Sequence, residues 1–260
     1  MNQIPHLSAT FSTLFFAGSM LLSAGAFAQH GGPTDIDGSV WGVGLAAILE
    51  SSPYRGVDDE TKALPVVTFE NRWVRVFGPG LEVKLGTVGD TALGLTATYS
   101  DNGFKASDSP FLSGMGERKN SAWLGLRGRH AFDWATMSSE ISVDASDHSG
   151  GTKVRIGMER RFALGELGIT PRLAATWIDR EFTRYYYGVS TGEARPGRSA
   201  YSPDATVNTS AGVRLDYRLA PQQTLFLDLG VEVLGQQIRK SPLVDRRSVP
   251  EVRLGYLYRF

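Results

Sequence analysis

The chain contains no cysteine among its 260 residues. It therefore forms no disulfides, and a cysteine nucleophile, a thiolate zinc site or an iron–sulfur cluster is excluded. After residue 28, no stretch approaches ~18 uninterrupted apolar residues, so a helical membrane span is not expected there. Neither sign of charge is in excess, at 27 basic and 27 acidic residues. This balance argues against a basic surface, and we expect no nucleic-acid partner.

The start of the chain lacks charge altogether. Residues 1–28 contain no Lys, Arg, Asp or Glu, and residues 11–27 are apolar or small throughout. The segment ends in Ala-Phe-Ala, the small-x-small pattern that signal peptidase cuts. Because the first residues also lack Lys and Arg, a retained membrane anchor stays open as an alternative. We expect residues 1–28 to be a cleaved signal peptide and residues 29–260 to form one exported domain.

The mature chain is rich in two-residue alternation. In its last segment the apolar residues are Val252, Leu254, Tyr256, Tyr258 and Phe260, and mostly polar or small residues lie between them. A strand with one apolar and one polar face fits a membrane barrel with lipid outside and a polar lumen inside. An edge strand of a soluble sandwich alternates in the same way, so this segment alone leaves both possibilities open.

The same alternation recurs along the chain, and no helical period competes with it. It predicts twelve strands, at 39–51, 63–71, 73–78, 81–87, 91–101, 119–130, 133–145, 152–163, 166–180, 204–218, 223–236 and 248–260. Gly78-Pro79-Gly80 separates the two shortest, and without that pair ten strands remain. Pro171 lacks a backbone donor inside a strand, which predicts a local bulge.

The connections between these strands alternate in length. Short turns are expected near residues 86–90, 131–133, 164–166 and 219–222, and long polar loops near 52–62, 101–118, 146–150, 180–203 and 237–247. Short turns at one end and long loops at the other are typical of transmembrane barrels, whereas a soluble sandwich has no reason to segregate them. We therefore predict an all-β fold: a transmembrane antiparallel up-and-down β-barrel. Aromatic residues near the strand ends would form interfacial girdles: Trp41, Trp73, Tyr99, Trp134, Trp177, Tyr217, Tyr256 and Phe260.

Few residues could support catalysis. The mature chain keeps only His30, His130 and His148, and no two share a strand face. Neither a Ser-His-carboxylate set nor a histidine-rich metal site is therefore expected. We predict no catalytic residues, no metal and no cofactor, and a protein that is not an enzyme.

The inward faces of the last strands carry charges of both signs. Arg214, Asp228, Glu232 and Arg253 are expected to pair across the lumen, because unpaired charges in a narrow interior are costly. Such a network would make a stiff and poorly conducting body. The alternative is a wetted channel in which these charges are free in water.

The longest predicted loop combines aromatic and basic residues. Tyr185, Tyr186 and Tyr187 follow Arg184, and rigid aromatic side chains lose little entropy on contact with a partner. The loop can serve as a partner-binding surface or fold over the barrel mouth as a lid. The sequence does not separate these two possibilities.

Several motifs resemble the MltA-interacting protein/OmpV (MipA/OmpV) family of Gram-negative outer-membrane proteins. They are Ser-Pro-Tyr-Arg-Gly-Val-Asp at 52–58, Leu-Pro-Val-Val at 64–67, Tyr-Tyr-Tyr-Gly-Val-Ser at 185–190, Ser-Pro-Leu-Val-Asp-Arg-Arg-Ser at 241–248 and the ending at 255–260. The resemblance spans essentially the whole mature chain and implies a barrel in the cell outer membrane. It implies contact with outer-membrane lipid and lipopolysaccharide, and the terminal aromatic suits recognition by the barrel-assembly machinery.

For its namesake, the family implies a scaffold that links a lytic murein transglycosylase to a murein synthase. It offers no catalytic residues to carry over. The expected function is thus a structural or scaffolding protein for murein-synthesising and murein-cleaving enzymes. Two alternatives remain: a small-solute or antibiotic-permeable channel, and a surface adhesin. A fold alone does not decide among them.

Overall fold

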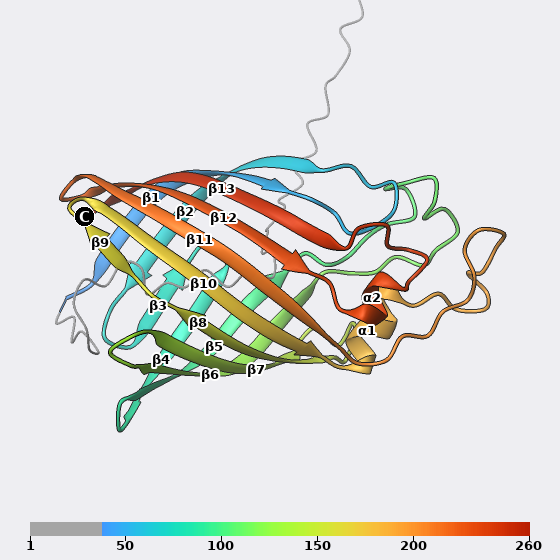
Figure 1. The fold of residues 1–260 in the computed structure, drawn as a ribbon, viewed down its shortest axis with the longest axis horizontal. Helices are drawn as coiled ribbons and strands as arrows, with labels where there is room; N and C mark the ends of the chain where they lie inside the picture. Colours follow the sequence, from blue (N-terminus) through green and yellow to red (C-terminus); the bar gives the residue numbers. More distant parts are fainter. Residues whose placement is uncertain (1–37) are drawn as a thin grey trace, which may run out of the picture.

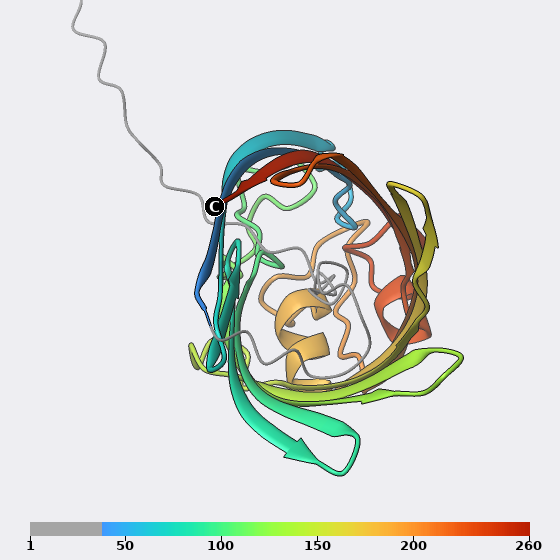
Figure 2. The same cartoon turned by 90° about the vertical axis from the view of Figure 1, so that its left-hand side faces the viewer.

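A computed structural model describes residues 38–260. The predicted signal peptide, residues 1–28, and His30 lie outside the described residues. The chain forms an antiparallel β-barrel in which the last strand pairs with the first (Figures 1 and 2). Its strands are β1 (Val40–Glu50), β2 (Glu60–Glu70), β3 (Val74–Phe77), β4 (Gly80–Val88), β5 (Thr91–Ser100), β6 (Ser121–Ala131), β7 (Thr136–Asp144), β8 (Thr152–Glu159), β9 (Phe162–Leu164), β10 (Leu167–Ile178), β11 (Thr206–Ala220), β12 (Gln223–Val233) and β13 (Ser248–Arg259).

The wall has the predicted twelve strands. Strands β8 and β9 both pair with β10, and they continue one register: Arg172 faces Glu159 and Ile169 faces Phe162. They therefore act as one strand, which matches the predicted segment 152–163. The two short segments around Gly78-Pro79-Gly80 are also strands, β3 and β4, so the reduced ten-strand version does not apply.

The expected bulge at Pro171 is wrong. Pro171 faces Val213 in β11 without any shift of register. On the other side of β10, Pro171 lies opposite the break between β8 and β9. Pro171 has no amide proton to donate there, but its carbonyl accepts a hydrogen bond of 3.2 Å from the amide of Arg160. The chain interrupts the partner strand there and inserts no extra residue.

Side chains alternate between the two faces of the wall as the sequence predicted. In β13, Leu254 is 53% exposed and Leu257 only 1% exposed, because the first points outward and the second inward. Large apolar side chains cover the outside of almost every strand, which is the surface that acyl chains solvate. Exposed aromatic residues gather near the strand ends: Trp41, Trp73, Trp134, Trp177, Tyr217 and Phe260.

Connection lengths segregate to the two ends of the barrel (Figure 1). At one end lie tight turns, and at the other lie the long loops 51–59, 101–120, 145–151, 179–205 and 234–247. Two short helices interrupt the long loops: α1 (Arg180–Tyr187) and α2 (Gln236–Arg239). No helix among residues 38–260 is long and apolar enough to cross a membrane.

Candidate functional site

Four of the long loops pack into one apolar core at the barrel mouth. We call this set the mouth core. Its buried members are Tyr54, Phe104, Leu112, Met115, Trp123, Ile178, Phe182, Tyr186, Tyr187, Val189, Leu234, Ile238, Leu243 and Val244. Viewed from the short-turn end, α1 lies inside the outline of the wall (Figure 2). The loops therefore fold inward over the mouth.

Helix α1 places the three tyrosines of the candidate loop. Asp179 precedes the helix as its N-cap, and its side chain accepts a hydrogen bond from the amide of Phe182 at 2.9 Å. Tyr186 is fully buried, and its hydroxyl donates to the carbonyl of Lys119 at 2.9 Å. Tyr187 is buried as well and stacks on Tyr54, with 5.6 Å between the ring centroids.

The other two candidate residues of this loop lie nearer the surface. Tyr185 is partly exposed and packs edge-on against Tyr186 at 4.8 Å. Arg184 is exposed, and its Nε donates to the carbonyl of Pro203 at 3.3 Å. The four residues are therefore close together, but only Tyr185 and Arg184 present surface to a partner.

Two arginines outside the predicted set tie the loops together. Arg118 in loop 101–120 forms an ion pair of 2.9 Å with Glu193 in loop 179–205. Arg198 is 1% exposed, and its guanidinium donates to the carbonyls of Phe111, Ser113 and Glu193. The contacts that join the two loops could not be predicted from the sequence, because they join residues distant along the chain.

The carboxyl group of Glu193 depends on these contacts for its charge. Burial acts to raise its pKa. This effect is outweighed by hydrogen bonds from the amides of Gly116 and Ser190 and from the Ser190 hydroxyl, and by the positive charge of Arg118. Together they lower the pKa of Glu193 from 4.5 to about 2. A depressed folded-state pKa stabilises the fold above the unfolded-state pKa, and this stability is lost as the pH falls.

We therefore expect the mouth loops to loosen as the pH falls from about 4.5 towards 2. Hydrogen exchange of the amides of Gly116 and Ser190 measures this loosening. The Glu193→Gln variant cannot ionise, so it should exchange faster at neutral pH and lose this part of the pH dependence. An unchanged pH profile in the variant would contradict the assignment to Glu193.

The predicted lumen charges lie on three neighbouring strands, β11, β12 and β13. Arg214 faces Asp228 across the β11–β12 ladder, and Asp228 faces Arg253 across the β12–β13 ladder. All three are almost fully buried, and the Arg214 guanidinium lies 4.8 Å from the ring centre of Phe226. Glu232 lies nearer the mouth end of β12 and accepts a hydrogen bond of 3.2 Å from the Asn208 side chain.

The direct partners of these charges include residues beyond the predicted four. Asp228 forms an ion pair with Arg172 of β10, and Arg253 forms one with Glu251 of its own strand. The pair of Arg172 and Asp228 reaches across β11 at Gly212, where an added Cβ would lie 3.0 Å from the Arg172 guanidinium. The missing side chain of Gly212 is therefore what leaves room for this pair.

Further ion pairs line the inside of the wall. They are Arg75–Glu70 at 2.6 Å, Lys84–Glu70 at 2.7 Å, Arg75–Glu82 at 3.3 Å, Arg127–Glu140 at 2.7 Å, Arg129–Glu159 at 2.8 Å and Arg161–Asp216 at 2.5 Å. Within residues 38–260, positive and negative side chains thus alternate around the lumen, without a ring of one sign. A single-sign ring is the usual device for ion selection.

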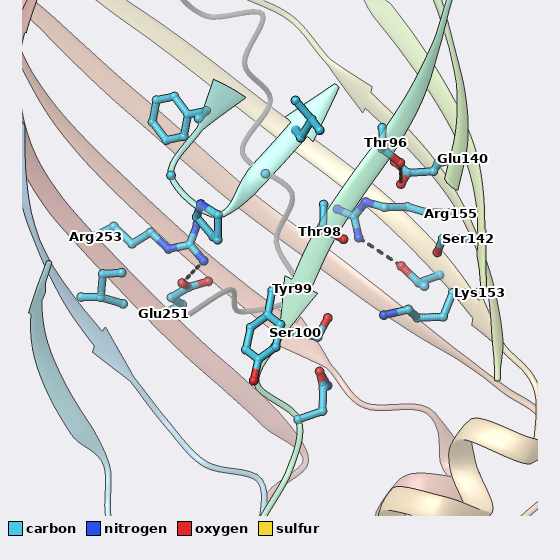
Figure 3. A pocket seen from close by; sticks show the side chains of 18 of the residues that line it. Thr96, Thr98, Tyr99, Ser100, Glu140, Ser142, Lys153, Arg155, Glu251 and Arg253 are labelled. Atoms are coloured by element: carbon cyan, nitrogen blue, oxygen red, sulfur yellow. Dashed lines mark hydrogen bonds and ion pairs between the residues drawn. The ribbon is translucent and has the colours of Figure 1, made fainter. Parts of the chain in front are cut away.

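Two cavities lie inside the barrel, one within this charged layer and one at the mouth. The lumen cavity has a volume of about 200 Å³ and is bordered by the charges of Glu140, Arg155 and Arg253 (Figure 3). The mouth cavity has a volume of about 810 Å³ and lies beside the mouth core. The two cavities share Glu50, Tyr99, Asn102, Tyr187, Glu232 and Glu251 as lining residues.

The described residues offer no group of His, Cys, Asp or Glu side chains that could hold a metal ion. His130 contacts Thr91 at 3.0 Å near the short turns, and His148 contacts the carbonyl of Asn120 at 2.8 Å in the loops. The two histidines are therefore at opposite ends of the barrel.

Comparison with known proteins assigns the chain to a family. The sequence model of the MltA-interacting protein MipA family matches residues 43–260. The putative outer membrane protein YiaT of Escherichia coli K12 is 27% identical over 84% of this chain and 90% of its own. The MltA-interacting protein of the same strain is 26% identical over 84% and 89%. The outer membrane protein OmpV of Vibrio cholerae is 23% identical over 97% and 98%.

Among solved structures, an outer membrane channel from Pseudomonas putida F1 aligns with a TM-score of 0.41 and 12% identity, over 86% of this chain and 96% of that one. The relatives named above are outer-membrane proteins, and none carries the name of an enzyme. The family match, the closed wall and its apolar exterior agree with one another: this chain is an outer-membrane β-barrel protein of the MltA-interacting protein MipA family.

Proposed function

We propose that the protein is a rigid, non-conducting and non-enzymatic barrel that acts as a structural or scaffolding protein in the cell envelope. The single observation that carries this proposal is the combination of a packed mouth core with a lumen whose wall is lined by buried ion pairs. The loops contribute twelve of the fourteen buried residues of this core, which fixes them over the mouth, and the paired charges narrow the lumen below it.

In this proposal Tyr186 and Tyr187 act as part of a lid, whereas Tyr185 and Arg184 remain available at the surface. The burial of the first two supports the lid over a partner-binding role for the whole cluster. Arg214, Asp228, Glu232 and Arg253 stiffen the wall, together with Arg172.

The proposed partners are murein enzymes, a lytic transglycosylase and a murein synthase. One relative is named for its interaction with MltA, and in outer-membrane barrels the short turns lie on the periplasmic side, where murein lies. The turns at that end are short, but exposed apolar side chains lie in them or on the adjoining strand ends: Leu85, Val88, Phe132, Leu164 and Leu219. These residues offer a docking surface in spite of the short turns.

A conductance measurement tests the closed barrel. In planar lipid bilayers, the purified protein is expected to show no stable openings, because the ion pairs and the mouth core obstruct the lumen in series. A refolded porin in the same bilayer controls for insertion. Reproducible nanosiemens-scale openings of the unmodified barrel would contradict the proposal.

One observation favours a second candidate, a small-solute channel. The mouth cavity of about 810 Å³ adjoins the lumen cavity, so a solute could enter from the loop end. A channel would then require a path through the charged layer. Conductance separates the two candidates, because only the channel predicts openings.

Co-purification tests the partner class. Envelopes that carry a tagged barrel are solubilised in mild detergent, and the captured proteins are identified by mass spectrometry. The proposal predicts murein enzymes among them, and predicts their loss in a variant with Val88→Glu and Leu164→Glu. The control variant is Asp90→Lys, which changes a charge in a short turn at the same end of the barrel as Val88 and Leu164. Val43→Glu is unsuitable as a control because the Val43 side chain faces lipid.

A further inference from the structure

The ring of strands closes near the short-turn end, but the wall is lower between β2 and β5 than elsewhere. Strand β2 pairs with β1 over its whole length, but it pairs with β3 only from Thr68 to Glu70. Strands β3 and β4 form a short hairpin that turns at Gly78 and Pro79. Beyond that turn, residues 38–260 place no strand between the upper halves of β2 and β5. We call this gap the lateral opening.

The sequence explains why the wall stops there. Gly78 has a φ of +53°, which favours glycine, and Pro79 after it cannot donate to a ladder. On the opposite margin, Pro65 lies in β2, and proline is common in strands with a free edge because it donates nothing to a ladder. Glu60 and Lys62 carry charge along the same edge, a usual protection against unwanted pairing. The β3–β4 turn below the gap and its β2 margin are thus built as edges.

The lumen cavity passes through this gap. Pro65 and Leu81 belong to the outward-facing sets of β2 and β4, and both are exposed. Glu140 and Arg253 belong to the inward-facing sets and are buried. All four line one cavity. In Figure 3, Thr98, Tyr99 and Ser100 of β5 lie on one side of it, and Glu251 and Arg253 lie on the other.

The outer end of this cavity lies at the depth of the membrane. In the neighbouring β1, Leu45 faces Pro65 and Leu49 faces Thr61, and both leucines are exposed on the outside of the wall. Leu124 of β6 faces Ala97 of β5 and is exposed as well. The lateral opening is therefore flanked on both sides by the apolar band. Above it, the ion pair of Lys62 and Asp101, at 3.8 Å, joins the two margins.

We propose that the lateral opening admits one acyl chain of a bilayer lipid into the lumen cavity. The cavity begins at the acyl layer and is lined next to the gap by Leu64, Val66, Ile48 and Phe226. These side chains match an alkyl chain, and burial of apolar area drives its entry.

Size limits the occupant. The cavity of about 200 Å³ is smaller than the ~300–1,000 Å³ of common small-molecule sites. It therefore suits part of a single chain and leaves the remainder of the lipid in the bilayer. The charged inner end, with Lys153, Arg155 and Arg253, stops the chain from crossing the lumen, because an alkyl chain cannot replace their polar contacts.

Photo-crosslinking tests the proposal. The full-length mature barrel is refolded in phosphatidylcholine vesicles that contain a phosphatidylcholine with a diazirine at the end of one chain. After illumination, labelled peptides are mapped by mass spectrometry. We expect labels on the inward residues Ile48, Val66 and Phe226 in addition to labels on the outward Leu254. Labels confined to outward residues would overturn the proposal.

Two variants block the cavity independently: Thr98→Trp from β5 and Ile48→Trp from β1, both at positions that line it. Each should reduce labelling of Phe226 several-fold and leave labelling of Leu254 unchanged. Thr209→Trp is the matched control, because Thr209 is exposed on β11 and does not line the cavity. Heat-modifiable migration in gels confirms folding of every variant. Undiminished labelling of Phe226 in both folded blocking variants would also overturn the proposal.

Discussion

Replacement of Tyr186 with alanine should open the barrel mouth. Tyr186 is 0% exposed and contacts Phe182 at 4.6 Å between ring centroids. Truncation of a buried aromatic residue costs about 3–5 kcal/mol. The mouth core is joined to the wall by loops, so this loss is expected as local opening and not as unfolding of the barrel. Openings that the unmodified barrel lacks should appear in planar bilayers.

Limited trypsin digestion provides a second measurement of the same change. Since 1.4 kcal/mol corresponds to a factor of ten, the open population should rise by about 100-fold or more. Cleavage after the basic residues of loop 179–205 should accelerate accordingly. Tyr185→Ala, at the partly exposed neighbour, should have a much smaller effect. Tyr186→Phe isolates the hydroxyl, which bonds to Lys119 and Ser121. Equal digestion rates for Tyr186→Ala and Tyr185→Ala would contradict the role of the mouth core.

The wall could be predicted from the sequence because it follows from a local property. Lipid outside and paired charges inside impose a two-residue period on every strand. That period places Leu254 outward and Arg253 inward without knowledge of any other strand. The even number of strands followed from the alternation of short and long connections. Only the detail at Pro171 was wrong, because a missing donor can be accommodated by a break in the partner strand as well as by a bulge.

Helix α1 could not be predicted from periodicity, since eight residues are too few for a clear helical pattern. Its local signals were present, namely Asp179 as the N-cap and Glu181 in the first turn. What stabilises the helix is the packing of Phe182 and Tyr186 against residues from other loops. Those contacts are not visible in the sequence, and so the choice between lid and surface loop stayed open.

The partners of the lumen charges were only partly predictable. Alternation identified which side chains face inward, but the partner of each charge depends on the stagger of the strands. Arg172 reaches Asp228 across the intervening strand at Gly212. Gly168 leaves similar room for the pair of Arg161 and Asp216. Glycine at an inward position between opposite charges two strands apart is therefore a useful signal for such pairs.

Removal of Asp228 should destabilise the barrel more than loss of any surface charge. Its carboxylate is 4% exposed, forms an ion pair with Arg172 and faces the fully buried Arg214. Breaking a buried pair by removing one partner costs about 3–5 kcal/mol, because the other charge stays buried without compensation. Asp228→Ala should therefore lower the urea concentration at the midpoint of unfolding from lipid vesicles. Asp90→Ala, at an exposed turn, should leave it unchanged.

A double-mutant cycle with Arg172→Ala identifies the cause. If the cost of Asp228→Ala arises from an uncompensated Arg172, the double variant should cost less than the two single variants together, by about 0.5–3 kcal/mol. Gly212→Val changes no charge, but its side chain would meet both the Leu229 carbonyl oxygen and the Arg172 guanidinium, so it should also destabilise the barrel. In the Asp228→Ala background, Gly212→Val should cost less. Strict additivity in both cycles would mean that the pair across β11 contributes nothing, and the stiffness proposed for the lumen would then have to come from the other pairs.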